Sequence, residues 1–244
     1  MNFNKNFIEY IMNELKPTLG EIICDPAMNN GDLLVGAVEY LNEKHEDRIV
    51  WDRLEDTLFG IDSSYENVGT VRNRLQQFNI SNTLFLSDSA PQYYYDVIMS
   101  DVRDINMITY IVDSLKTFGR AAMIVPFTFL IDETKKYIHM RSYLSNHSNI
   151  YKVISYYHYS IIFINKKSNT SQVYFYDLVE RNNLLIEEDN TVLDIAYIQK
   201  NNYVLFDNTQ LPPLIPCIED YYYHKRILEE ADEINSKKCK INTN

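Results

Sequence analysis

The stretch Glu21-Ile-Ile-Cys-Asp-Pro-Ala-Met-Asn-Asn-Gly-Asp-Leu-Leu-Val-Gly-Ala37 decides the fold of this chain. An apolar run ends in an acid and a proline, a short polar turn with Gly31 follows, and helical spacing of apolar residues then begins. A strand, a tight turn and a helix in this order bring backbone N–H groups and a helix N-terminus against a ligand. The stretch therefore predicts a nucleotide-type binding site at the end of a buried strand.

Strand-like and helical runs alternate on both sides of this stretch. Helices are expected at 6–16, 32–44, 65–78, 105–118 and 134–146, and strands at 21–24, 58–61, 84–86, 96–100 and 120–125. Such alternation predicts a mostly parallel sheet with helices on both faces. Three further runs, at 150–157, 160–165 and 172–176, leave no room for crossover helices, so we expect them to form an antiparallel edge. Residues 1–176 are the predicted domain, and 177–244 an acidic, loop-rich extension with one helix at 219–235.

Size and composition fit one α/β domain with an appendage. The chain has 244 residues, 45% of them hydrophobic and 13% aromatic, which argues against global disorder. Its formal net charge is −11 at pH 7. A protein that grips a phosphate backbone by itself normally carries a basic face. We therefore expect DNA contact only through a partner or a local basic patch.

The cysteines and histidines indicate a compartment and exclude a metal centre. Three cysteines, Cys24, Cys217 and Cys239, lack metal or redox spacing, which favours a reducing compartment. Five histidines show no ligand spacing, so no metal is expected. No signal peptide is visible, and no apolar run approaches the roughly 18 residues of a membrane span. These features predict a soluble, cytoplasmic protein.

Three acids lie where predicted strands end. Asp25 follows the first strand, Asp62 the second and Asp88 the third. Open α/β sheets bind ligands beyond the carboxyl ends of their strands, at the switch in strand order. A single acid in such a place is often only a helix cap. Three in succession favour a ligand site.

The turn after Asp25 resembles motif I of the N6-adenine DNA methyltransferases, specifically the modification subunits of type I restriction systems. That family reads Asp-Pro-Ala-Cys-Gly-x-Gly-Gly-Phe-Leu there; the matching residues are Asp25, Pro26, Ala27, Gly31 and Leu34. Asn29 and Asp32 replace two family glycines. The resemblance implies a class I (Rossmann-like) methyltransferase fold that binds S-adenosylmethionine through this turn. It also implies that Asp62 lies at the cofactor ribose and Asp88 near its adenine.

The fourth strand end carries the catalytic motif in that family, Asp/Asn-Pro-Pro-Tyr/Phe. Its polar residue accepts hydrogen bonds from the adenine amino group, and its aromatic ring stacks on the flipped base. This chain reads Asp101-Val-Arg-Asp104, with Asp101 at the polar position, no prolines and a carboxylate at the stacking position. Two interpretations stay open. Asp101 selects an altered substrate, or the site has decayed and Asp101 caps the following helix.

These departures lead to one expected function and two rivals. The first is a degenerate relative of the methyltransferases that acts as a binding or assembly subunit and binds S-adenosylmethionine weakly or not at all. The second is an active S-adenosylmethionine-dependent adenine-N6 methyltransferase with a changed target. The third is an acidic decoy of a restriction-modification complex, with the run Glu187-Glu188-Asp189 as a solvated loop or a DNA mimic. A protein partner or a second copy of the chain is expected in the first.

Overall fold

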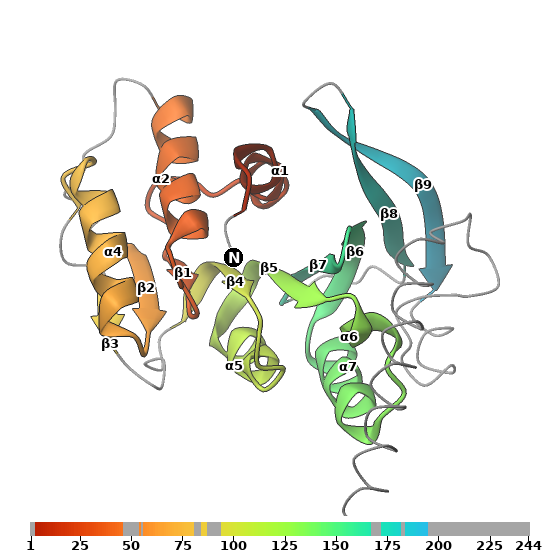
Figure 1. Cartoon of the computed structure of the whole chain (residues 1–244). Coiled ribbons are helices and arrows are strands. Elements are labelled where there is room, and N and C mark those ends of the chain that lie inside the picture. Colours follow the sequence, from red (N-terminus) through yellow and green to blue (C-terminus); the bar gives the residue numbers. More distant parts are fainter. Residues whose placement is uncertain are drawn as a thin grey trace, which may run out of the picture. The chain divides into compact units, whose positions relative to one another are not determined.

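The expected alternation of strands and helices builds one mixed sheet (Figure 1). The computed structural model describes residues 3–45, 54, 56–80, 84–86, 94–166, 172–181 and 184–194. In chain order the elements are α1 (Lys5–Leu15), β1 (Ile23–Asp25), α2 (Asp32–Lys44), β2 (Leu58–Asp62), α4 (Tyr65–Gln76), β3 (Leu84–Leu86), β4 (Tyr95–Asp101), α5 (Met107–Ser114), β5 (Leu115–Pro126), α6 (Thr128–Ile131), α7 (Lys135–His147), β6 (Asn149–Tyr156), β7 (Tyr159–Asn165), β8 (Gln172–Arg181) and β9 (Leu184–Asp194).

The strand order places a topological switch beside the first strand. Within the described residues the sheet has nine strands in the order β3-β2-β1-β4-β5-β7-β6-β8-β9. Strand β1 lies between β2 and β4 and is parallel to both, with Ile23 opposite Leu58 on one side and Val97 on the other. Strand β7 runs antiparallel between β5 and β6. The mostly parallel sheet with antiparallel strands at one side is therefore confirmed.

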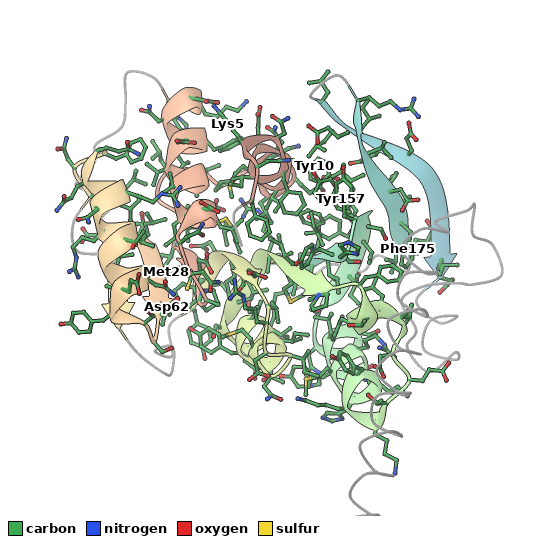
Figure 2. The ribbon with its side chains drawn as sticks, viewed as in Figure 1. Lys5, Tyr10, Met28, Asp62, Tyr157 and Phe175 are labelled. Carbon is green, nitrogen blue, oxygen red and sulfur yellow. The ribbon has the colours of Figure 1, made fainter. Side chains whose placement is uncertain are left out.

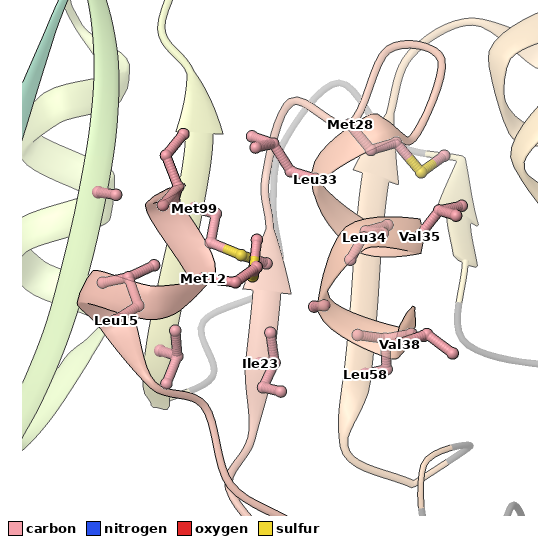
Figure 3. Packing of buried hydrophobic residues seen from close by; sticks show 14 of the residues in the cluster. Met12, Leu15, Ile23, Met28, Leu33, Leu34, Val35, Val38, Leu58 and Met99 are labelled. Carbon is pink, nitrogen blue, oxygen red and sulfur yellow. The ribbon is translucent and has the colours of Figure 1, made fainter. Parts of the chain in front are cut away.

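One apolar core fills the space between the sheet and the helices α1, α2 and α4. Figure 3 shows Met12 of α1 and Leu34 of α2 above the strands that carry Ile23, Leu58 and Met99. Helices α5 and α7 cover the other side of the sheet (Figure 1). The stripe expected on the first helix is largely confirmed, with Ile8 half-buried and four residues buried: Phe7, Ile11, Met12 and Leu15. Burying a stripe of this size stabilises the helix by several kcal/mol, at about 25 cal/mol per Å² of apolar surface.

The helix expected at 105–118 is shorter than predicted. Helix α5 ends at Ser114, and β5 begins at Leu115. Phe118 has φ of 70° and is 73% exposed, a left-handed conformation that a helix cannot contain. Lys116 turns to Asp96, its Nζ 2.7 Å from Oδ2. The apolar spacing that suggested a helix through Phe118 thus comes from a short helix followed by a strand.

The acidic segment after Asp177 also departs from expectation, because its described part is a strand. β8 pairs parallel with β6, not antiparallel as expected, and β9 returns antiparallel to β8. Leu185 packs against the core, and Glu187 meets Lys152, its Oε1 2.6 Å from Nζ. A carboxylate on the same face of the strand as Leu185, paired with a distant lysine, disguises the period-two pattern of a strand. The loop interpretation of Glu187 and Glu188 was therefore wrong.

The sheet continues beyond the predicted domain boundary. Tyr176 lies inside β8, and Met1–Leu205 forms one compact unit. The helix expected at 219–235 lies outside the described residues, so the division of the chain into two domains stays a prediction. Among the described helices, none has the length and apolar character needed to cross a bilayer.

Candidate active site

The carboxyl ends of β1, β2 and β4 meet at one edge of the sheet and bring three predicted site residues together. Asp25, Asp62 and Asp101 are the last residues of these strands. The pairings Asp25 with Gly60 and Cys24 with Ile98 show that β2 and β4 each extend two residues beyond the level of Asp25. Asp88 lies outside the described residues. The structure thus assembles the expected edge from segments up to 76 positions apart in the sequence.

The turn after β1 keeps the left-handed geometry that glycines normally supply. Gly31 has φ of 80° and donates its N–H to the Met28 carbonyl at 2.7 Å. A methyl group at Gly31 would lie 2.7 Å from Val71 of α4, so close packing also requires glycine there. Asn29 has φ of 48°, and asparagine tolerates this region better than most residues. The replacement of a family glycine by Asn29 therefore leaves the turn intact.

Hydrogen bonds within the turn fix its two ends. Asp25 Oδ1 accepts the Ala27 N–H at 3.1 Å across Pro26, and Asn29 Nδ2 donates to the Ala27 carbonyl at 2.7 Å. Asp25, Pro26 and Ala27 thus form the turn itself. Helix α2 begins directly afterwards, with Gly31 as its N-cap and no side-chain cap.

Asp62 holds the turn against the next helix. Its Oδ2 accepts the Asn29 N–H at 3.0 Å, and its Oδ1 accepts the Ser64 N–H at 2.8 Å. Asn67 of α4 donates its Nδ2 to both carboxylate oxygens at 3.1 Å. Figure 2 shows Met28 and Asp62 beside each other at this edge. A carboxylate with this many donors is already satisfied by the protein.

Asp32 is the centre of a contact network that the sequence did not reveal. Arg74 Nη1 donates to Asp32 Oδ1 at 2.7 Å and to the Asn30 carbonyl at 2.6 Å. The Phe3 N–H and Asn30 Nδ2 donate to the other carboxylate oxygen at 3.1 and 2.8 Å. Asp32 is 9% exposed. No sequence signal connects Arg74, in the last turn of α4, with the start of α2.

Burial leaves Asp25 as an unusual acid. Burial first, and then the carboxylates of Asp101, Asp62 and Asp32, raise the pKa of Asp25 well above its usual range. The Ala27 N–H acts in the opposite direction. A carboxyl group shielded from water and surrounded by like charges favours its neutral form. We infer that Asp25 is protonated where exposed carboxyl groups are ionised.

The end of β4 has the strand but not the stacking turn. Asp101 is 7% exposed and pairs with Arg103, Oδ2 to Nε at 3.2 Å. Val102 is buried and donates its N–H to the Ile124 carbonyl at 2.8 Å. Asp104 Oδ1 accepts the Asn106 N–H at 3.0 Å. Asp104, and not Asp101, thus stabilises the turn that leads into α5, which corrects the expectation that Asp101 caps that helix.

The described residues around this turn enclose little space. A cavity of about 10 Å³ lies among Asp25, Asn29, Asp32 and Asp101, with Phe3 closing one side. That is about the space of one water molecule. Within the described ranges, no group of three or more metal-binding side chains exists. A cavity of this size is too small for a large ligand.

Comparison of the sequence with protein-family models and with curated proteins gives no match. The structure resembles a modification subunit of a putative type I restriction enzyme from Vibrio vulnificus YJ016, with a TM-score of 0.63 and 16% identity over 74% of this chain and 47% of that chain. It also resembles a chain from a study of complex assembly and conformational transition in the type I restriction-modification system (TM-score 0.70, 15% identity, 97% of this chain and 66% of that one). A putative class I S-adenosylmethionine-dependent methyltransferase from Listeria monocytogenes matches with a TM-score of 0.58 and 14% identity over 83% of this chain and 70% of that one.

These likenesses and the strand order agree. The chain has the class I methyltransferase fold. It spans about half the length of the Vibrio vulnificus subunit. At this level of identity, the class I methyltransferase fold is what the two proteins share.

A row of aromatic rings runs from Phe3 to the turn between β6 and β7. Phe3 stacks on Phe7 at 5.2 Å between ring centroids, Phe7 on Tyr156 at 4.9 Å, and Tyr156 meets the exposed Tyr157 edge-on at 4.7 Å. Asn4 Nδ2 donates to the Tyr156 hydroxyl at 3.3 Å. The row ties the segment before α1 to the turn between β6 and β7. It explains how Phe3 comes to face Asp32.

Proposed function

We propose that this chain is a methyltransferase-fold protein that does not transfer methyl groups to adenine and acts as a binding or assembly subunit. The end of β4 carries this proposal. Asp101 is engaged by Arg103, and Asp104 occupies the position where a stacking aromatic would hold a flipped base. A carboxylate cannot stack on a base, and the turn has no prolines to set its shape.

The described residues of the turn do not fit S-adenosylmethionine. Asp32 places a carboxylate where the family has a glycine without a side chain. Arg74 and the Phe3 N–H hold this carboxylate in the turn by hydrogen bonds. Asp62 is already satisfied by three protein donors. A cavity of about 10 Å³ among the described residues of the turn is far smaller than the roughly 300 Å³ or more of ligand pockets. Opening the turn costs these contacts, so we expect weak cofactor binding.

A methyl-transfer assay tests the proposed function. The purified chain is incubated with radiolabelled S-adenosylmethionine and adenine-containing duplex DNA, beside the Asp101→Ala variant. We expect no transfer above background from either protein. Transfer by the parent chain that the variant abolishes would overturn the proposal.

Calorimetric titration with S-adenosylmethionine and with its demethylated product tests the cofactor separately. Asp32, which replaces a family glycine, should weaken binding by about 1–3 kcal/mol, because its contacts must be broken to open the turn. We expect weak or undetectable heat. A submicromolar dissociation constant would show that the turn opens readily.

One observation favours the second candidate, an active methyltransferase with a changed target. Asn29 and Gly31 keep the left-handed turn on which cofactor recognition in the resembling family depends. If the titration shows tight binding, this candidate gains and Asp101 becomes the residue expected to contact substrate. The acidic decoy gains no such support, because Glu187 and Glu188 of its acidic run pair with Lys152 and Arg181.

A protein partner fits this proposal better than direct DNA binding. The net charge of −11 repels a phosphate backbone. One similar structure comes from a study of assembly in the type I restriction-modification system. The expected partner is a second copy of the chain or a larger modification-type subunit that supplies the DNA contacts.

A further inference from the structure

A groove of about 250 Å³ runs between α1 and α2, on the outer side of the Asp32 network. Residues at successive helical spacings on each helix line it, so each contributes one stripe of its surface. Lys5, the first residue of α1 and labelled in Figure 2, also lines the groove. The Asp101 end of β4 is not among its lining residues. The groove shares Phe3, Asp32 and Arg74 with the network at the candidate site, but Asp25, Asp62 and Asp101 do not line it.

The floor of the groove is apolar. Ile8 and Met12 of α1 meet Val35 of α2 there, and Ile8 is only half-buried. Gly36 allows the helices to come close, since a methyl group at this position would lie 2.1 Å from Ile8 Cγ2. The half-buried ring of Tyr40 forms part of one wall. Such a floor can bury apolar side chains of a partner.

The rim of the groove is negative. Glu9, Glu39 and Glu43 line it, and none of the three makes an ion pair within the described residues. Asp32 and Arg74, which also line it, neutralise one another at 2.7 Å. Of the lining residues, Lys5 then opposes the three carboxylates. The Tyr40 ring already accepts a cation, with the Lys44 ammonium 5.5 Å from its centroid.

We propose that this groove binds a basic amphipathic segment of a protein partner, with apolar side chains on its floor and lysine or arginine at its acidic rim. This proposal rests on the binding-subunit function and names the chemistry of its partner. The volume of about 250 Å³ lies below the roughly 300–1,000 Å³ of most small-molecule sites. Charge complementarity selects the basic segment over an acidic or neutral one.

Fluorescence anisotropy with two labelled synthetic helical peptides tests the groove. One peptide combines leucine with lysine, and the other combines leucine with glutamate. We expect the full-length chain to bind the lysine peptide at physiological salt and not the glutamate peptide. Reversing Glu39 and Glu43 together to lysine should weaken binding about tenfold, because like charges then face each other. Tyr40→Ala should weaken it about threefold through loss of the ring.

The matched control reverses two exposed acids outside the groove, Glu133→Lys with Glu180→Lys, and changes the net charge equally. This control should bind the lysine peptide within about twofold of the parent. If both double variants weaken binding of the lysine peptide equally, the peptide is attracted by the overall charge of the chain and not by the groove. That result would overturn the proposal. The neutral pair Glu39→Gln with Glu43→Gln repeats the test should the charge reversal disturb folding.

The groove and the proposed function can fail separately. If the chain binds no peptide and transfers no methyl group, the groove proposal is wrong and the proposed function stands. If the chain binds the lysine peptide and also transfers methyl groups, the groove proposal stands and the proposed function is wrong.

Discussion

At the scale of single residues, Asp25 shows how burial changes an acid. Its folded-state pKa is raised by burial and by neighbouring carboxylates. The folded chain therefore keeps a proton that the unfolded chain releases above about pH 4. The contribution of Asp25 to stability is full below that pH and falls as pH rises toward the folded-state pKa. The contribution of Asp25 to the free energy of unfolding should therefore be larger at acidic pH than at neutral pH.

Asp25→Asn should remove this dependence, because the amide stays neutral and its oxygen can still accept the Ala27 N–H. We expect the variant to be more stable than the parent at neutral pH. The difference in unfolding free energy between the variant and the parent should grow by about 1.4 kcal/mol per pH unit. This holds while folded Asp25 is protonated and the unfolded side chain is ionised. Urea unfolding across pH 4–8 measures it, with exposed Asp56→Asn as the control. A gap that does not change with pH would contradict the protonated state.

Asp32 is the second residue whose replacement gives a clear expectation. Asp32→Gly removes the carboxylate that holds Arg74 and the Phe3 N–H, and so reopens the turn. S-adenosylmethionine affinity should rise roughly 10- to 100-fold, which corresponds to about 1–3 kcal/mol. Calorimetric titration reads the change, and Asp56→Gly, at an exposed turn, should leave affinity unaltered. Equal affinity of parent and Asp32→Gly would show that Asp32 does not close the site.

At the scale of elements, Lys152 fastens β9 to the rest of the sheet. Its ammonium lies 2.8 Å from Glu14 Oε2 of α1 and 2.6 Å from Glu187 Oε1 of β9. It also lies over the Tyr10 and Tyr176 rings, at 5.5 and 5.1 Å from their centroids. The Lys152 side chain is 12% exposed, so these contacts are shielded from solvent. One cation thereby joins β6, α1 and β9.

Lys152→Met should destabilise the chain by about 3 kcal/mol, because it leaves Glu14 and Glu187 partly buried without a cation. Hydrogen exchange should show faster exchange in the β9 amides than in β1. The comparison is Arg181→Met, whose pair with Glu188 is exposed (62% for the Arg181 side chain) and should contribute less than about 1 kcal/mol. Similar losses in both variants would mean that burial of Lys152 adds nothing.

At the scale of the whole molecule, the net charge gives an expectation about DNA binding. The chain should not retard duplex DNA at physiological salt, because its net charge of −11 opposes the phosphates. Gel mobility and light scattering of the full chain test this together. Tight, salt-sensitive DNA binding by a strict monomer would contradict it. Retardation only after a modification-type subunit is added would support it.

The sequence by itself determined the architecture near the first strand. The bounds of α2 were predicted at 32–44 and observed at Asp32–Lys44, and the three-residue β3 was predicted at its observed position. Periodicity, turn residues and helix stops are local, so a single chain segment carries them. The same local reasoning failed at the α5–β5 junction, where a left-handed Phe118 interrupts an apolar run.

Only the tertiary structure decided which side chains the acids meet. Asp32 meets Arg74 42 residues away, and Glu187 meets Lys152 35 residues away. Such pairs depend on which strands become neighbours, and the sequence pattern of either partner alone contains no record of the other. The acidic run at Glu187 therefore resembles a solvated loop in the sequence, and only the structure shows that Glu187 pairs with Lys152. The contacts of Phe3 and Arg74 with Asp32 have the same origin, because both residues reach the turn through packing and not through sequence proximity.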